Sequence, residues 1–333
     1  MRESFITSCL KNGVSRKIAD KVFEQLAAFA AYGFCKAHAV AYAVLAYQTL
    51  WLKYHYPTEF FAAVLSNQPM GYYPPQVLVD EAKRAGVKVL PPDVNHSFDH
   101  YTVENGAIRV SLRQLKGISE DALTSILSAR AQGGFTSVRD FILRTNVGWP
   151  TIESLARVGA FDSLDSREEV FSQLPKLSIL KRRAGRATRP LFEEACEESD
   201  TVPETTGDAM TERMLAEREL LSLNLTAHPI DVLYADNGLT RMKDLGSVAT
   251  GETVTIAGSV IRYQTPPTRN GNRVMYVIME DGTGIADVTV FGDVQEKCGP
   301  VLFRESWLKV IGVIQRIGPK ALSIIAKDLT PLR

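Results

Sequence analysis

A short tract in the middle of the sequence has the residue types and spacing that bind phosphate. It reads Leu115-Lys116-Gly117-Ile118-Ser119 and is followed by an apolar stripe at helical spacing. In a helix-hairpin-helix motif, a glycine-bearing hairpin like this one directs free backbone amides, and the start of the next helix, toward a phosphate of DNA. The plainer alternative is an ordinary packing corner between two helices. The residues predicted to contact a DNA backbone are Lys116, Gly117, Ile118 and Ser119.

A second group that suits an anion lies near the N-terminus. Lys36 and His38 follow Gly33 and Phe34, at the start of a predicted helix, where unpaired amides favour negative charge. A nucleoside triphosphate or a DNA phosphate is a sensible ligand for such a pair. The alternative is that both side chains simply face solvent near a helix cap.

A third group surrounds a Pro-Pro/Asn-Gly loop between two predicted strands near the C-terminus. It combines cations with aromatic rings, as proteins that bind single-stranded nucleic acid do, because cations follow the backbone and rings stack under bases. Barrels also need aromatic core residues and loops are often basic, so packing is the competing interpretation. The predicted single-strand contacts are Arg262, Tyr263, Arg269, Arg273, Tyr276 and Phe291.

Other chemistries lack their residues in this sequence. Two-metal phosphoryl transfer needs clustered carboxylates, and no two aspartates stand two positions apart. No Gly-x-x-x-x-Gly-Lys-Ser/Thr phosphate loop occurs, and the cysteines form no Cys-x-x-Cys pair. His96 and His100 have metal-like spacing but lie in a predicted loop without a nearby cysteine. We therefore expect no catalytic residue, resident metal or cofactor in these residues.

The composition is that of a globular protein of two or three domains. The 333 residues are 45% hydrophobic, and the 38 basic residues balance the 38 acidic ones. No uncharged apolar run is long enough to cross a membrane, and the N-terminus lacks the order of a signal peptide. The cytoplasm is the expected location, with no membrane partner.

Hydrophobic periodicity predicts a multidomain α+β fold. Residues 1–95 are expected to be helical, and residues 96–175 to form shorter helices with a hairpin at Asn105-Gly106. Blocks of opposite charge predict a linker over 176–208, and a helical connector over 209–250 follows. Over 251–333 the period changes to two, and five short strands predict a small all-β barrel of the OB-fold type.

Several of these tracts together resemble the bacterial C-family DNA polymerases, the DNA polymerase III alpha subunit type. Residues 33–68 carry a pattern found in the fingers domain of that family, with Gly33, Phe34, Lys36, His38 and Tyr42 at its positions. Residues 115–122 and 159–164 are similar to its tandem helix-hairpin-helix region. Residues 216–230 and 271–291 are similar to its connector and its OB-fold. Around Tyr72-Tyr73-Pro74-Pro75, residues 69–95 look like the error-prone, ImuC-type branch.

The resemblance implies a domain order and a function. Residues 1–95 would be the C-terminal part of the fingers, 96–175 the tandem helix-hairpin-helix region, and 251–333 the OB-fold. The family reaction is templated nucleotidyl transfer from dNTPs with Mg²⁺, used by the error-prone branch in damage-induced mutagenesis. Lys36 and His38 would contact the nucleotide or a phosphate, the hairpins would hold duplex DNA, and the barrel would hold the single-stranded template.

The resemblance also has departures. The PHP domain and the palm, which carries the catalytic aspartates, precede this region in the family and have no counterpart here. The expected function is thus that of a DNA-binding C-terminal portion of an error-prone polymerase. The alternatives are a non-functional truncated remnant, or a part that acts with a separately encoded palm. A sliding clamp and mutagenesis accessory proteins are further implied partners, although Pro190-Leu191-Phe192 lacks the glutamine of a clamp-binding motif.

Overall fold

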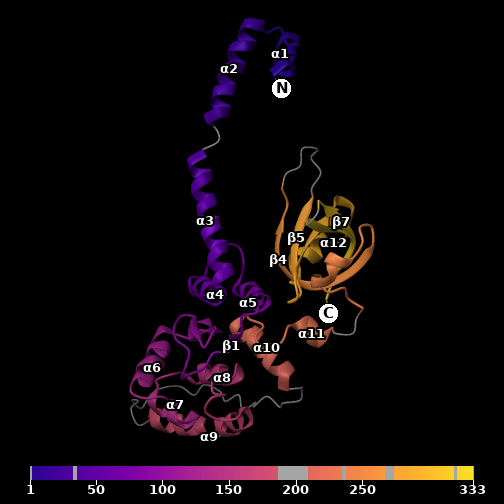
Figure 1. Ribbon diagram of the computed structural model, residues 1–333. Helices are drawn as coiled ribbons and strands as arrows, with labels where there is room; N and C mark the ends of the chain where they lie inside the picture. The colour runs from indigo at the N-terminus through magenta and orange to yellow at the C-terminus, as the bar shows by residue number, and fades with distance from the viewer. Residues whose placement is uncertain are drawn as a thin grey trace. The chain divides into compact units, whose positions relative to one another are not determined.

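The computed structural model of the chain describes residues 2–32, 36–186, 209–234, 238–266, 274–318 and 321–332. The chain forms two compact units, Met1–Tyr56 and Pro57–Arg333 (Figure 1). Among the described residues, no helix is both long and apolar enough to cross a membrane.

The first unit consists of three helices in its described part. They are α1 (Arg2–Lys11), α2 (Arg16–Tyr32) and α3 (Lys36–His55). α1 packs on α2 through Phe5 and Phe23, whose ring centroids are 5.6 Å apart, and Arg2 pairs with Asp20 at 3.1 Å. The turn between α1 and α2 occurs at Gly13, which has a positive φ.

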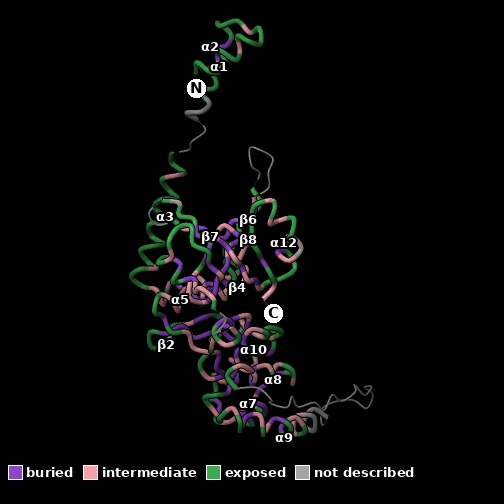
Figure 2. Tube along the Cα trace, turned by 90° about the vertical axis from the view of Figure 1, so that its right-hand side faces the viewer, coloured by how far each residue is buried: buried purple, intermediate pink, exposed green. Residues whose placement is uncertain are grey.

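This unit buries few of its apolar side chains. Of its described residues, Ile6 and Ala19 alone are buried, and Figure 2 shows α3 as exposed along nearly its whole length. Tyr47 and Tyr54 are 70% and 81% exposed although both are large rings. An apolar surface of this extent is typical of a segment that covers, or is covered by, another protein surface.

The second unit begins with helices around a small sheet. A parallel β1–β3 pair and an antiparallel β2–β3 pair form the sheet, and Asn105 and Gly106 turn the hairpin with φ of 51° and 76°, as the sequence predicts. The elements are α4 (Pro57–Ser66), α5 (Pro75–Arg84), β1 (Val89–Leu90), β2 (Thr102–Glu104), β3 (Ala107–Arg109), η1 (Leu112–Gln114), α6 (Glu120–Ala131), α7 (Val138–Arg144), α8 (Trp149–Arg157) and α9 (Arg167–Arg186).

The core of this part does not follow the domain boundary expected at residue 95. Phe61 and Leu65 of α4 and Val79 of α5 lie in the same buried cluster as Ile108 and Leu123. These helices therefore fold with the residues that follow them, and the division of the chain falls between Tyr56 and Pro57 instead. The reason is that α4 and α5 pack on the small sheet, a contact that periodicity alone does not reveal.

α9 corrects the expected start of the linker at residue 176. The helix begins at a capping box, where the Ser166 amide donates to Glu169 Oε2 at 3.1 Å, and it runs to Arg186 through Pro175. Leu174 and Leu177 are both buried, so the apolar stripe continues across the proline. Burial of that stripe against α7 and α8 outweighs the hydrogen bond that proline removes.

A connector of short elements leads to the barrel. It comprises α10 (Ala209–Leu221), α11 (Pro229–Leu233) and η2 (Met242–Ser247). Glu217 of α10 is fully buried and accepts hydrogen bonds from the amides of Leu225 and Thr226 at 3.0 and 2.8 Å, which fixes the chain after the helix. α10 also contacts α8, so the connector is anchored on the helical part.

The C-terminal part is a closed five-stranded barrel, as predicted. Its strands follow the order β4-β5-β6-β8-β7, with a parallel pair between β6 and β8 and antiparallel pairs elsewhere. The strands are β4 (Thr253–Gln264), β5 (Met275–Glu280), β6 (Ile285–Val290), β7 (Trp307–Ile317) and β8 (Ala321–Pro331).

One helix of the barrel region is not anticipated by the sequence pattern. α12 (Gly292–Arg304) joins β6 to β7 and packs on the barrel with Cys298 and Leu302 buried. Two glycines and Pro300 lie within its sequence, which obscures its helical period. Its apolar side nevertheless finds a partner in the barrel core, and this contact decides the local structure.

Candidate nucleic-acid interface

The hairpin at Gly117 has the geometry expected of a backbone-binding turn. Gly117 has a φ of +80°, and a Cβ placed on it would meet no atom within 4 Å, so the turn is open on its outer side. Ser119 caps α6, since its Oγ accepts from the Ala122 amide at 3.1 Å. Among the described residues, the amides of Gly117 and Ser119 have no backbone acceptor. These two amides, just before α6, are free to bind an anion.

Lys116 is directed elsewhere in this structure. Its amide donates to the Leu220 carbonyl and its Nζ donates to the Glu219 carbonyl, both at 2.8 Å. The residue therefore ties the hairpin to the end of α10. Two acids, Glu120 and Asp121, begin α6, and the exposed carboxylate of Glu120 pairs with Arg113. Phosphate binding at this hairpin would rest on backbone amides more than on the lysine charge.

The second hairpin differs from the first in its surroundings. Gly159 also has a positive φ, +78°, but a Cβ there would lie 2.6 Å from Arg213 Nη2 and 2.7 Å from Asp162 Oδ2. Arg213 and Asp162 form an ion pair of 2.7 Å across the turn. α10 thus covers this hairpin, whereas the hairpin at Gly117 is open.

Lys36 and His38 lie in the first turn of α3 and are both exposed. The ring of His38 packs edge-on against Tyr42 with centroids 4.5 Å apart. The residues Gly33 and Phe34 that precede them in the polymerase-like pattern are outside the described residues. The contact of Lys36 and His38 with a nucleotide remains a prediction.

The predicted single-strand residues divide between two faces of the barrel wall. Along β5, Val277 is buried in the core, so its neighbours Tyr276 and Ile278 face outward. On β4, Arg262 pairs with Ile278 and therefore shares the outward face, whereas Tyr263 pairs with Val277 and points to the other side. Arg262 and Tyr276 belong to one surface, and Tyr263 does not.

Tyr263 instead packs against α12. Its ring meets that of Phe303 edge-on, with centroids 5.1 Å apart. Phe291, at the N-cap of α12, is 46% exposed, like Tyr276 at 47%. Two further predicted residues, Arg269 and Arg273, lie outside the described residues. The outward surface of β4 and β5, with Arg262 and Tyr276, is the part of the prediction that the geometry brings together.

α5 contacts the barrel next to this surface. Gln76 Nε2 donates to Glu280 Oε1 at 2.8 Å, and Arg84 donates to the Gly282 carbonyl at 3.3 Å. Ser259 of β4 donates to the same Glu280 oxygen at 2.9 Å. The end of β5 is therefore held by residues some 200 positions earlier in the sequence, which the sequence pattern does not indicate.

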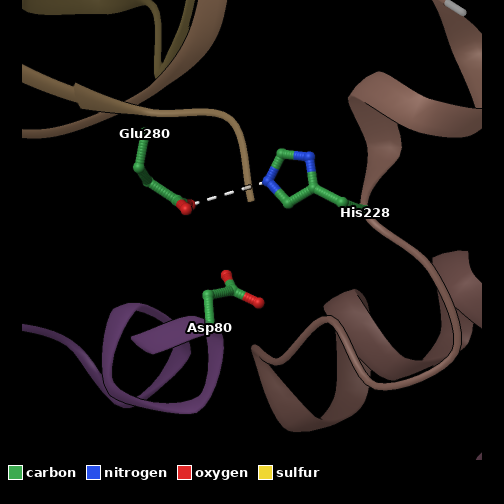
Figure 3. Close-up of side chains that lie close together, drawn as sticks. All are labelled: Asp80, His228 and Glu280. Carbon is green, nitrogen blue, oxygen red and sulfur yellow. Dashed lines mark ion pairs between the residues drawn. The ribbon is translucent and has the colours of Figure 1, made fainter. Parts of the chain in front are cut away.

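A buried polar cluster lies at the centre of this contact (Figure 3). Asp80 of α5, His228 before α11 and Glu280 of β5 are all buried, and one potential ligand atom of each lies within 4.8 Å of the others. His228 Nε2 is 3.7 Å from Glu280 Oε1 and has no hydrogen-bond partner among the described residues. Such a set of donors could in principle hold a metal ion.

The tautomer of His228 argues against a metal ion. His228 is the N-cap of α11, and its Nδ1 accepts from the Ile230 amide at 3.3 Å. An imidazole that accepts at Nδ1 carries its proton on Nε2, so no lone pair on Nε2 is directed at the carboxylates. A histidine that binds metal through Nε2 needs the opposite arrangement, with a proton on Nδ1. The cluster therefore fits a shared proton better than it fits a metal ion.

Burial gives the two carboxyl groups different acidities. It raises the pKa of Asp80 to about 7, with the Glu280 charge adding to the effect and His228, Lys83 and Arg84 opposing it. Burial acts in the same direction on Glu280, but the adjacent His228 and then the hydrogen bonds from Ser259 and Gln76 hold its pKa below the usual value. Glu280 is thus the charged member of the pair, and Asp80 the one that readily holds a proton.

Family comparisons agree with both nucleic-acid-binding parts. Residues 86–170 match a model described as a helix-hairpin-helix motif, and this range contains both hairpins. Residues 254–332 match a model described as an OB-fold nucleic acid binding domain, which covers the closed barrel.

Relatives from two groups of polymerases match nearly the whole chain. An error-prone DNA polymerase of Symbiobacterium thermophilum is 34% identical over 92% of the chain, and one of Sinorhizobium medicae is 32% identical over 98%. The DNA polymerase III subunit alpha of Pasteurella multocida is 33% identical over 94%. The chain spans 32%, 32% and 28% of these relatives, about a third of their length. Over almost all of its length, this chain is thus related to the bacterial C-family DNA polymerases, both the error-prone enzymes and the DNA polymerase III alpha subunits.

Proposed function

We propose that this chain is the DNA-holding portion of an error-prone DNA polymerase III alpha-like protein and takes part in damage-tolerant DNA synthesis. The hairpin at Gly117 would bind the backbone of duplex DNA, and the outward surface of β4 and β5 would bind the single-stranded template. The observation that carries the proposal is the open hairpin together with a barrel surface that presents a cation, Arg262, beside an exposed ring, Tyr276.

The two surfaces call for different ligands. Backbone amides at a helix start recognise a phosphate without reading a base, which suits duplex DNA. A cation beside exposed rings suits single-stranded DNA, since every base has a face that can stack. The near-equal identities to the two groups of relatives do not separate them, so the error-prone assignment rests on the resemblance of residues 69–95.

In the complete polymerase, we propose that Lys36 and His38 contact the phosphates of an incoming dNTP, while Mg²⁺ acts at the palm. Both side chains are exposed at the start of α3, where the helix dipole favours an anion. Photo-crosslinking with an azido-dATP probe should label the wild-type chain near α3, and Lys36→Ala should reduce that labelling severalfold. Equal labelling of both proteins would contradict this role.

The main proposal is tested by binding to fluorescently labelled primer–template and single-stranded DNA across a salt series. Binding that rests on phosphate contacts should weaken steeply as salt rises, and each lost contact should reduce the slope of log K against log salt by about one. The double variant Arg269→Ala/Arg273→Ala removes two predicted contacts with single-stranded DNA. It should weaken binding and reduce the slope by about two.

A charge-matched control separates specific contacts from the effect of net charge. Lys297 and Lys327 are exposed on α12 and β8, outside the proposed surface. Their double alanine variant should bind as the wild type does. A folded wild-type chain that binds neither ligand at low salt would overturn the proposal and favour the alternative of a non-functional remnant.

A further inference from the structure

The loop before α5 places an aromatic ring on the outward surface of the barrel. Arg262 Cζ lies over the ring of Tyr72 at 3.9 Å from its centroid. With the Gln264 amide oriented so that its oxygen faces Arg262, the guanidinium also donates to that oxygen at 2.8 Å. The arginine is thus held between a neighbour on its own strand and a ring from the helical part.

Tyr72 is not a buried contact despite this pairing. Its side chain is 73% exposed, more than either Tyr276 or Phe291. A ring has two faces, and Arg262 covers one of them. The large exposed fraction means that the other face is open to solvent. A cation on one face of a flat, exposed ring leaves the opposite face free for stacking.

The position of the loop is fixed by the contacts of α5. Two residues after Tyr72, Pro74 is the N-cap of that helix and Pro75 its first residue, and both restrict the backbone. In the first turn of the helix, Gln76 donates a hydrogen bond to Glu280 at the end of β5. Because Tyr72 lies four residues before Gln76, its ring is held at the barrel surface and does not sweep freely through solvent.

We propose that Tyr72 is a base-stacking residue, which takes a nucleobase of single-stranded DNA on its open face while Arg262 holds the covered face. This inference rests on the proposed function and adds a contact from outside the barrel to it. The stacking surface would then run from Tyr276 on β5, past Arg262 on β4, to Tyr72. Stacking needs only a π-face, so the subsite accepts any base.

The test is binding of a labelled oligothymidylate to the full chain, measured by fluorescence anisotropy. Loss of one stacked base costs about 1–3 kcal/mol, so Tyr72→Ala should weaken binding by about 5- to 150-fold. Tyr72→Phe should bind as the wild type does, because it keeps the ring. The salt slope should not change in either variant, because tyrosine carries no charge. Tyr73→Ala, one residue away and 48% exposed, is the matched control and should keep wild-type affinity.

A direct readout separates stacking from a structural role. An oligonucleotide that carries 5-iodouracil should crosslink to Tyr72 on irradiation, and mass spectrometry of the digested protein should locate the adduct there. If Tyr276→Ala weakens binding while Tyr72→Ala does not, and no adduct forms at Tyr72, the subsite is wrong but the proposed function stands. If the wild-type chain binds no oligothymidylate at all, the proposed function fails with it.

Discussion

Replacement of Asp80 by asparagine should flatten the pH dependence of folding stability above about pH 5. Asp80 is 4% exposed at the contact between α5 and the barrel, and burial raises its pKa from 3.8 to about 7. At pH values between these two pKa values, the folded chain therefore keeps a proton that the unfolded chain has already released. The contribution of Asp80 to the free energy of unfolding is fully present below about pH 3.8 and is lost as the pH rises toward 7.

The size of the effect follows from the shift. Each pKa unit corresponds to about 1.4 kcal/mol, so the difference between 3.8 and about 7 amounts to about 4 kcal/mol in total. Of this, about 2.5 kcal/mol is lost between about pH 5 and pH 8. Glu280 has a lowered pKa, so its own contribution changes only below its usual value near 4.5 and leaves this window unaffected. Asparagine keeps the shape of Asp80 without the charge.

The assay is urea unfolding of the wild type and of Asp80→Asn at several pH values from about 5 to 8. Between about pH 5 and pH 8, the difference in free energy of unfolding between the two proteins should change by about 2.5 kcal/mol in favour of the variant. Asp99→Asn is a suitable control, because Asp99 is exposed and its pKa is lowered. Parallel curves for wild type and Asp80→Asn across this range would refute the argument that Asp80 holds a proton.

Four further substitutions test contacts described above. Gly159→Ala and Gly117→Ala should each lower the free energy of unfolding by about 1–2 kcal/mol, because alanine is strained at a positive φ. The loss should be larger for Gly159→Ala, since its new methyl group meets Arg213. Equal losses in urea unfolding would contradict the difference between the two hairpins. Glu217→Gln should lower the free energy of unfolding by about 2 kcal/mol or more, because an NH₂ group would replace a buried carboxylate oxygen and face the amides after α10. An unchanged melting temperature would argue against this anchor. Ser119→Asp should keep the cap of α6 and its stability, yet weaken duplex binding by placing a negative charge beside the phosphate site; undiminished duplex binding would place the DNA elsewhere.

Local signals in the sequence were sufficient for much of the fold. The hairpin predicted at Asn105-Gly106 is confirmed, and the caps at Ser119 and Ser166 are likewise set by residues only a few positions away. The alternation of residues 253–290 likewise predicts strands, because the buried core of a barrel imposes a period of two. These features need no information from distant parts of the chain.

Features that depend on distant contacts could not be predicted in this way. Pro175 and the glycines of α12 suggest breaks, and only burial against α7, α8 and the barrel explains why both helices persist. The sequence singles out Arg262 and Tyr276, but it does not bring Tyr72 to them or separate Tyr263 from them. The cluster of Asp80, His228 and Glu280 joins three segments that share no motif, so no spacing rule would have found it.

The long separation between Gln76 and Glu280 has a consequence during protein synthesis. The ribosome completes α5 some 200 residues before the end of β5. The barrel in turn closes only when β8 reaches its partners β6 and β7. Until then, the barrel does not cover the side of α5 that carries Asp80, so the burial that raises the pKa of this carboxyl group is incomplete. The helical part thus gains its own core first, and uptake of a proton by Asp80 accompanies the late docking of the barrel.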